Sequence, residues 1–245
     1  MLLKTLIFQI FLVVVCAEEK CRLVSNLYDY LDFTRKQFQC DQKREVNLDY
    51  HETIDDEPYS ISFRCGYPAS SMYDLLPFFN VSDLEPVEEL IVSYCQLPKL
   101  YSTLEEKFPN VFRLILEHTR SLENFFDKET NIEEIKVNGE NVMKMENFPF
   151  LKMPKLRKID LHWCGSPILV LKNDEFADIP HLTHVTIWSC RVGILPDTLF
   201  RNSTNIQHID FSYNAIKHVP NTLFTNLSKL QTIGLSNNQI TSIDL

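Results

Sequence analysis

A repeated spacing of apolar residues constrains this chain more than any other feature of its 245 residues. The pattern at the C-terminal end consists of Leu230, Ile233, Leu235, Asn238 and Ile240. It recurs 24 residues earlier, from Ile206 to Ile216, and five further steps of 21 to 26 residues carry it back to Val87. Such periods are typical of structural repeats that stack on one another.

Each repeat alternates apolar and polar residues over a short run, which predicts a strand with one buried side. Asn or Cys occupies the eighth position after the first apolar residue in five of the seven repeats, where a side chain can satisfy buried backbone groups. Glu140 and Thr119 stand there in the other two, which we expect to be irregular. The pattern is the leucine-rich-repeat signature and predicts an α/β solenoid with a curved parallel sheet on its concave face. A chance apolar period in an ordinary α/β domain is the alternative.

The first residues indicate export. Leu2 to Val15 form a short apolar run after which Val15-Cys16-Ala17 resembles a cleavage site, so residues 1–17 are predicted to be a signal peptide. The run is too short for a membrane anchor, and no second stretch could span a bilayer. Removal of Lys4 leaves 23 basic and 33 acidic residues, a net charge of 23 − 33 = −10.

Six cysteines follow the predicted cleavage site, and in an oxidising compartment an even number favours disulfides over metal. Residues 18–84 lack the repeat and are predicted to be a cysteine-containing cap, and residues 85–245 to be about seven repeats, the last incomplete. Cys21–Cys40 and Cys65–Cys95 are the preferred pairs, although four cysteines allow three connectivities. Cys164 and Cys190 occupy equivalent positions in adjacent repeats; a bridge is open to them, but two buried thiols are preferred.

Composition argues against several function classes. The net charge is −9, which gives no electrostatic footprint for nucleic acid, and five glycines include no phosphate-binding loop. We therefore expect no nucleic-acid partner, no enzyme activity, no cofactor and no metal site. Three histidines, His162, His184 and His208, come from successive strands of an open face, which does not favour zinc.

The outward positions of the strands are the expected ligand-binding surface, because solenoids usually bind on the concave face. Both tryptophans and four of the seven histidines fall on these positions. The candidate ligand-binding residues are Tyr94, His118, His162, Trp163, His184, Trp188, His208 and Tyr213. Exposed aromatic residues are common interface anchors, although they also simply cover strand backbone. The sequons at Asn80, Asn202 and Asn226 predict glycans, the last two away from the strands.

One segment is more specific than the repeats. It comprises Ile61 to Cys65, Leu76-Pro77, Val87 to Val92 and Cys95-Gln96-Leu97-Pro98. This segment resembles the entry from cap to first repeat in insect-type Toll receptors. The resemblance extends to the signal peptide, the cap and the repeats, and it implies the N-terminal part of such an ectodomain.

The resemblance implies an extracellular receptor of innate immunity or development that binds a Spätzle-like cystine-knot cytokine, with receptor dimerisation open. It also implies a transmembrane helix and a signalling domain, neither of which this sequence contains. The sequence stops partway through a repeat, so we expect a piece of a longer protein. A secreted or surface leucine-rich-repeat adhesion, matrix or decoy protein, or an enzyme inhibitor on the same fold, is the alternative.

Overall fold

The computed structural model describes most of the predicted repeats and parts of the preceding segment. The described residues are 21–28, 34–40, 44–51, 60–65, 84, 87–94, 106–119, 129–139, 150, 153–164 and 169–243. Among these residues, side chains are described from Ser60 onward, except those of Arg64, Cys65, Ser242 and Ile243.

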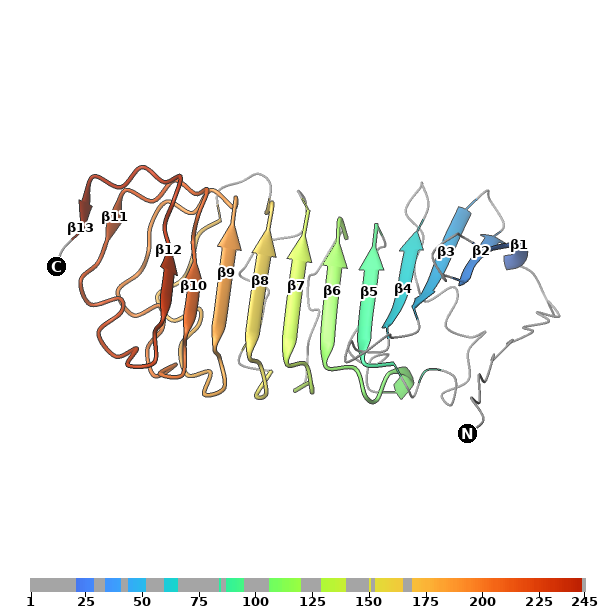
Figure 1. The fold of residues 1–245 in the computed structure, drawn as a ribbon, viewed down its shortest axis with the longest axis horizontal. Coiled ribbons are helices and arrows are strands. Elements are labelled where there is room, and N and C mark those ends of the chain that lie inside the picture. The colour runs from blue at the N-terminus through green and yellow to red at the C-terminus, as the bar shows by residue number, and fades with distance from the viewer. Residues whose placement is uncertain are drawn as a thin grey trace, which may run out of the picture.

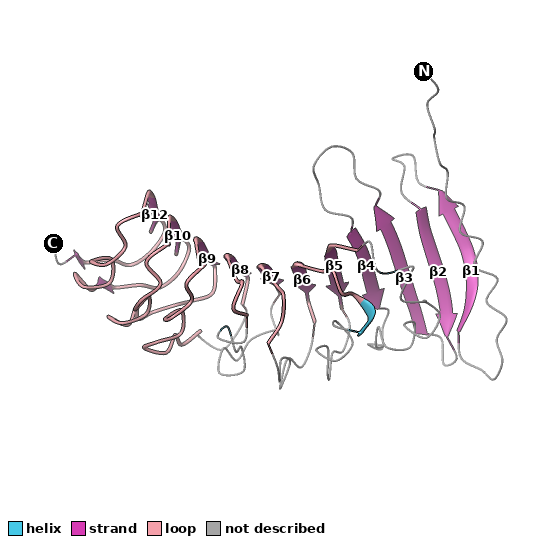
Figure 2. Cartoon of the chain, turned by 90° about the horizontal axis from the view of Figure 1, so that it is seen from below, coloured by secondary structure: helices cyan, strands magenta, loops and turns pink. Residues whose placement is uncertain are grey.

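The described residues form an elongated solenoid around one long sheet (Figure 1). The strands of this sheet, in spatial order, are β1 (Cys21–Tyr28), β2 (Thr34–Cys40), β3 (Arg44–His51), β4 (Ser60–Cys65), β5 (Glu89–Ser93), β6 (Arg113–Glu117), β7 (Glu134–Asn138), β8 (Lys158–His162), β9 (His184–Trp188), β10 (His208–Asp210) and β12 (Thr232–Gly234). A second pair, β11 (His218–Val219) with β13 (Ser242–Ile243), is parallel. The strands line the inner side of the curved array, with the connecting loops outside (Figure 2).

The sheet changes from antiparallel to parallel at β4. β1 to β4 pair antiparallel, whereas β4 pairs parallel with β5, with Ile61 opposite Leu90 and Phe63 opposite Val92. Ile61 and Phe63 are fully buried and belong to the same core as the repeats. The parallel stack therefore starts one strand earlier than the repeat pattern, within the segment predicted to be the cap.

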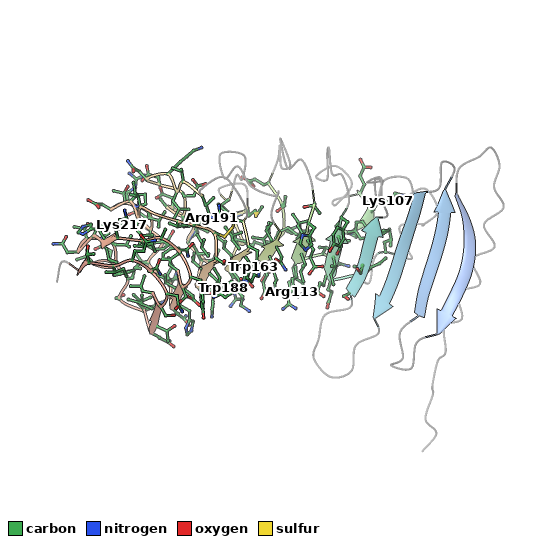
Figure 3. The ribbon with its side chains drawn as sticks, turned by 90° about the horizontal axis from the view of Figure 1, so that it is seen from above. Lys107, Arg113, Trp163, Trp188, Arg191 and Lys217 are labelled. Atoms are coloured by element: carbon green, nitrogen blue, oxygen red, sulfur yellow. A yellow bond between two sulfur atoms is a disulfide. The ribbon has the colours of Figure 1, made fainter. Side chains whose placement is uncertain are left out.

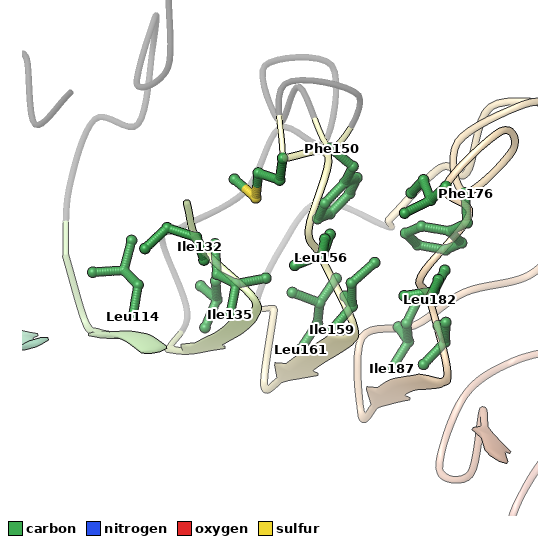
Figure 4. Close-up of a cluster of buried hydrophobic side chains, with 14 of the residues drawn as sticks. Leu114, Ile132, Ile135, Phe150, Leu156, Ile159, Leu161, Phe176, Leu182 and Ile187 are labelled. Carbon is green, nitrogen blue, oxygen red and sulfur yellow. The ribbon is translucent and has the colours of Figure 1, made fainter. Parts of the chain in front are cut away.

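The repeat pattern is confirmed as a strand pattern with one buried side. β6, β7 and β9 alternate partly exposed and buried residues along their whole length. Ile209 is 2% exposed and Phe211 is fully buried. Equivalent apolar residues of adjacent repeats stack into one continuous core (Figure 4), which is the reason that a single repeat would not be stable alone.

Phenylalanine rings from the half of the repeat opposite the sheet, together with the inward Phe211 that follows β10, form a row in this core. Phe150 lies 5.3 Å from Phe176, Phe176 lies 6.0 Å from Phe200, and Phe200 lies 6.2 Å from Phe211, measured between ring centroids. Leu199 and Phe200 are both buried, so this half of their repeat packs beneath the sheet.

The last strand shows what a missing neighbour does to this core. Ile233 on β12 is 44% exposed, whereas the equivalent Ile209 on β10 is 2% exposed. Among the described residues, no strand lies beyond β12 in the sheet, so one side of its apolar residue faces solvent.

Asparagines at the eighth position after the first apolar residue, called the ladder position, connect adjacent repeats. Their side chains form hydrogen bonds with backbone groups of both repeats. The Asn214 Oδ1 accepts hydrogen bonds from the backbone nitrogens of Cys190 and Val192, each at 3.0 Å. Its Nδ2 donates to the carbonyl oxygens of Ile187 at 2.7 Å and Phe211 at 2.9 Å. The predicted role of the ladder position is therefore confirmed at this residue.

The preference for buried thiols at Cys164 and Cys190 is wrong, because these residues form a disulfide. Both occupy the ladder position, in adjacent repeats whose strands pair directly, and their Cα atoms are 4.6 Å apart. That separation lies within the range that a disulfide spans. Equivalent positions on neighbouring strands thus bring the two sulfurs together.

The other predicted pairs are not tested. The backbone register places Cys21 directly opposite Cys40, but the side chains of Cys21, Cys40 and Cys65 lie outside the described residues, as does all of Cys95. Glu140 is also outside them. Thr119, at the other irregular ladder position, is fully buried.

Candidate functional site: an aromatic cluster at the end of the strands

The turn after each strand has a left-handed backbone in all seven repeats. The residues seven positions after the first apolar residue are Tyr94, His118, Gly139, Trp163, Ser189, Tyr213 and Asn237, and their φ angles lie between 48° and 130°. The backbone nitrogens of Trp163 and Tyr213 donate to the carbonyl oxygens of Trp188 and Ser236 in the next repeat, at 3.1 and 2.9 Å. The stacking of repeats therefore imposes this conformation whatever residue is present.

Four of these seven positions carry a ring, which is unusual for a left-handed residue. Gly and Asn adopt this conformation readily, whereas a bulky side chain there is an outlier that costs about 1–3 kcal/mol. Tyr94, Trp163 and Tyr213 are 42%, 51% and 51% exposed, so their rings do not regain this energy by full burial in the core. Strain of this kind is often retained at functional sites.

The aromatic cluster consists of His162, Trp163, Trp188 and Tyr213. Trp188, the last residue of β9, lies at its centre, with ring centroids 4.8 Å from Trp163, 4.7 Å from Tyr213 and 5.7 Å from His162. Trp163 and Trp188 lie next to each other beside the end of the sheet (Figure 3). The cluster combines a partly buried centre with two half-exposed neighbours.

A second ring pair lies nearer the N-terminus. Tyr94 stacks on His118 with 4.8 Å between ring centroids and 15° between ring planes. The next repeat has Gly139 at this position, where an added Cβ would lie 2.8 Å from the His118 nitrogen atoms. With its φ of 130°, Gly139 permits His118 to pack closely and separates this pair from the aromatic cluster.

The third group lies at the opposite end of the strands. His184 and His208, the first residues of β9 and β10, stack with 4.4 Å between ring centroids. The His208 Nδ1 is 2.7 Å from the Thr232 Oγ1. Burial, followed by the positive charges of His208 and Lys158, lowers the pKa of His184.

A row of alternating charges leads up to these histidines along the concave face. Arg113 forms ion pairs with Glu89 at 3.1 Å and Glu134 at 2.8 Å, and Lys158 pairs with Glu134 at 2.9 Å. Burial alone would raise the pKa of Glu134, but the hydrogen bond from Lys158 and the charge of Arg113 outweigh it and lower that pKa. The row is therefore charged at neutral pH and leaves no net excess of one sign.

The predicted ligand-binding residues thus separate into three groups. His162, Trp163, Trp188 and Tyr213 come together, Tyr94 pairs with His118, and His184 pairs with His208. His184 and Trp188 are the two ends of one five-residue strand, about 13 Å apart at 3.3 Å per residue. The charged row was not predicted from the sequence. When the repeats are aligned, acidic and basic residues alternate at the second position after the first apolar residue.

The remaining predicted sites are only partly visible. Asn202 and Asn226 are exposed, and the Asn202 Nδ2 donates to the Asp178 Oδ1 at 2.7 Å, whereas Asn80 lies outside the described residues. Their glycosylation stays a prediction. Within the described part of the chain, no three metal-ligating side chains converge. No helix in that part has the length and apolar character of a membrane span.

Comparisons with known proteins agree with the solenoid. Residues 180–240 match the family model described as leucine rich repeat. No curated protein sequence matches the chain. Two similar solved structures are a complex of TLR13 with ssRNA13, at 17% identity and a TM-score of 0.49, and the Drosophila Toll–Spätzle complex, at 17% identity and a TM-score of 0.42.

Each match covers most of this chain but only a small part of the known protein. The TLR13 match covers 68% of this chain and 24% of the TLR13 chain, and the Toll match covers 89% and 35%. This chain therefore spans about a quarter to a third of the length of either protein. The family match and the strand register together establish a leucine-rich-repeat solenoid. The expectations of no nucleic-acid partner and no enzyme activity stay untested.

Proposed function

We propose that this chain is the ligand-binding region of a Toll-like receptor ectodomain and that it recognises a protein through the aromatic cluster. The observation that carries the proposal is the placement of Trp163 and Tyr213, half-exposed rings held on left-handed backbone on either side of Trp188. The fold requires the left-handed turn but not the rings, as Ser189 and Asn237 at the same position demonstrate.

A protein partner suits this surface better than a small molecule. Tryptophan and tyrosine supply large apolar contact areas with few rotatable bonds, and they are enriched among the residues that dominate protein binding energies. The rings pack on one another in a row across three repeats rather than around a pocket. Polar groups, including the His162–Asp160 pair, lie beside the row and would form a hydrated rim.

The proposal of an insect-type Toll receptor in particular rests on the resemblance to these receptors at Ile61 to Cys65 and Val87 to Val92. It supports a signal peptide at residues 1–17, a cap at 18–84, repeats at 85–245, an extracellular location and glycans at the three sequons. It also supports a Spätzle-like cystine-knot cytokine as the ligand. An adhesion or decoy protein would share the fold but would not require this cytokine.

The experiment measures binding of a Spätzle-like cystine-knot cytokine to the glycosylated full chain and to Trp163→Ala. Truncation of a tryptophan that anchors an interface costs about 2–4 kcal/mol, so a loss of affinity of at least about 30-fold is expected. Ile194→Ala is the matched control, because Ile194 is 79% exposed and lies outside the cluster. Equal affinity of Trp163→Ala and the unmodified chain, with both folded, would remove the cluster from the site.

A further inference from the structure

A groove lies along the other edge of the sheet, where the strands begin. Its volume is about 470 Å³, within the range of roughly 300–1,000 Å³ that ligand sites occupy. The lining residues directly precede β7, β8, β9 and β10 or belong to the preceding turns. The groove thus runs across successive repeats, one strand length away from the aromatic cluster, and belongs to none of the three ring groups.

Three cations line this edge groove in a chain whose net charge is −9. They are Lys155, Arg157 and Lys229. The only acid in the lining is Glu133, whose carboxylate is 3.9 Å from Arg157, at the outer limit of an ion pair, and the Arg157 side chain is 60% exposed. Lys155 contacts no acid among the described residues, and the Lys229 Nζ donates to the Asn205 Oδ1 at 2.6 Å. Positive charge is therefore in excess here and open to solvent.

The rest of the lining is polar and uncharged, with hydroxyl, amide and imidazole groups from His181, Thr183, Asn205 and Gln207. The lining contains no aliphatic side chain and no tryptophan, tyrosine or phenylalanine. Peptide ligands usually need apolar anchors, and single-stranded nucleic acids usually stack their bases on aromatic rings. A ligand made of hydroxyl and anionic groups needs neither.

The positions of the cations indicate an extended ligand. Arg157 precedes β8, and Lys229 lies in the turn before β12, three strands further along the sheet. At about 4.8 Å per strand the backbones of the two residues are separated by about 14 Å, so the cations are spread over successive repeats. Neutral hydrogen-bonding groups fill the interval between them.

We propose that the edge groove binds an acidic polysaccharide. Sulfate groups contact Arg157 and Lys155 at one end and Lys229 at the other, and the sugar hydroxyls between them exchange hydrogen bonds with the amide and hydroxyl side chains. Charge-assisted contacts of this type are the stronger ones in such a site. The proposal is independent of the aromatic cluster and of the receptor identity.

The test measures the affinity of the full chain for a fluorescent heparin-derived oligosaccharide and for its desulfated form. The variant Arg157→Gln/Lys229→Gln should lose about two- to fivefold in affinity for each charge removed, the range of solvent-exposed ion pairs. Lys172→Gln/Lys217→Gln removes the same charge from exposed residues outside the groove and should lose less than about twofold in total. Gln207→Lys adds a charge inside the groove and should tighten binding by a similar factor, so the test does not depend on loss of function alone.

Binding of the sulfated probe that weakens with salt and follows these three variants would support the proposal. Equal affinity for the desulfated probe would overturn it, as would equal losses in the two double variants. A single-stranded oligonucleotide or an acidic peptide that bound more tightly than the oligosaccharide, with the same dependence on Arg157 and Lys229, would replace the polysaccharide as the ligand.

Discussion

Replacement of Asn214 by alanine tests whether the ladder position stabilises the contact between repeats. The change leaves the backbone nitrogens of Cys190 and Val192 without the Oδ1 acceptor that lies 3.0 Å from each. It also removes donors from the carbonyl oxygens of Ile187 and Phe211. A donor left without a partner on burial costs about 1–3 kcal/mol, and because this site is only partly buried the two donors together should cost about 2–4 kcal/mol.

The assay is urea unfolding followed by tryptophan fluorescence. Trp163 and Trp188 are the only tryptophans, and both belong to the repeats before Asn214, so they report on this interface. With an m-value of about 2 kcal/mol per molar urea, the midpoint should fall by about 1–2 M. Asn221→Ala is the control, because Asn221 is exposed and its substitution should stay within about 0.5 kcal/mol. Equal midpoints for the two variants would refute the reasoning.

Three further predictions concern the core, the disulfide and pH. Phe211→Ala should destabilise by about 3–5 kcal/mol in thermal unfolding, because the fully buried ring packs on Phe200; a change under about 1 kcal/mol would contradict the register. Replacing Cys164 and Cys190 by serine should cost about 3–4 kcal/mol for a sequence separation of 26, and an unchanged melting temperature would count against a stabilising bridge. Because the pKa of His184 is lowered below 6.5, the unfolded state binds more protons and stability should fall as the pH drops below that value. His184→Gln should lessen the loss between about pH 7.5 and 5.5, and an identical loss would oppose this account.

The core could be predicted from the sequence because stacking makes the repeat pattern redundant. Seven repeats carry the same three apolar positions, so a register error in one would be corrected by the others. The repeat pattern did not predict that β4 belongs to the parallel stack, because Ile61 and Phe63 lie on a single strand without a full repeat around it. The equivalent ladder positions of Cys164 and Cys190 indicated that the two residues are neighbours. The sequence alone does not distinguish two thiols from a disulfide at such a pair.

The candidate sites were harder to predict because they depend on how repeats face one another. The alternation of buried and outward residues along each strand could be predicted, but which outward residues meet depends on whether they lie at the start of a strand or after its end. His184 and Trp188 share one strand and yet join different groups for this reason. The cations of the edge groove fall at two different positions of the repeat, Lys155 and Lys229 at one and Arg157 at the other, so aligning the repeats does not reveal a single basic column.

The left-handed turns fix where the side chains that follow the strands lie at one edge of the sheet. Each repeat must turn there to continue its backbone hydrogen bonds to the next, and the conformation points the side chain outward whatever its identity. Trp163 and Tyr213 occupy this position two repeats apart, and Trp188, the last residue of β9, lies between them with ring centroids 4.8 and 4.7 Å from theirs. At the opposite edge the backbone before the strands also bonds from repeat to repeat, as from Thr183 to Arg157, but the groove residues there have no positive φ and their side chains are polar. One stacking geometry therefore produces an edge with an aromatic cluster and an edge with a polar, positively charged groove, two surfaces suited to different classes of ligand.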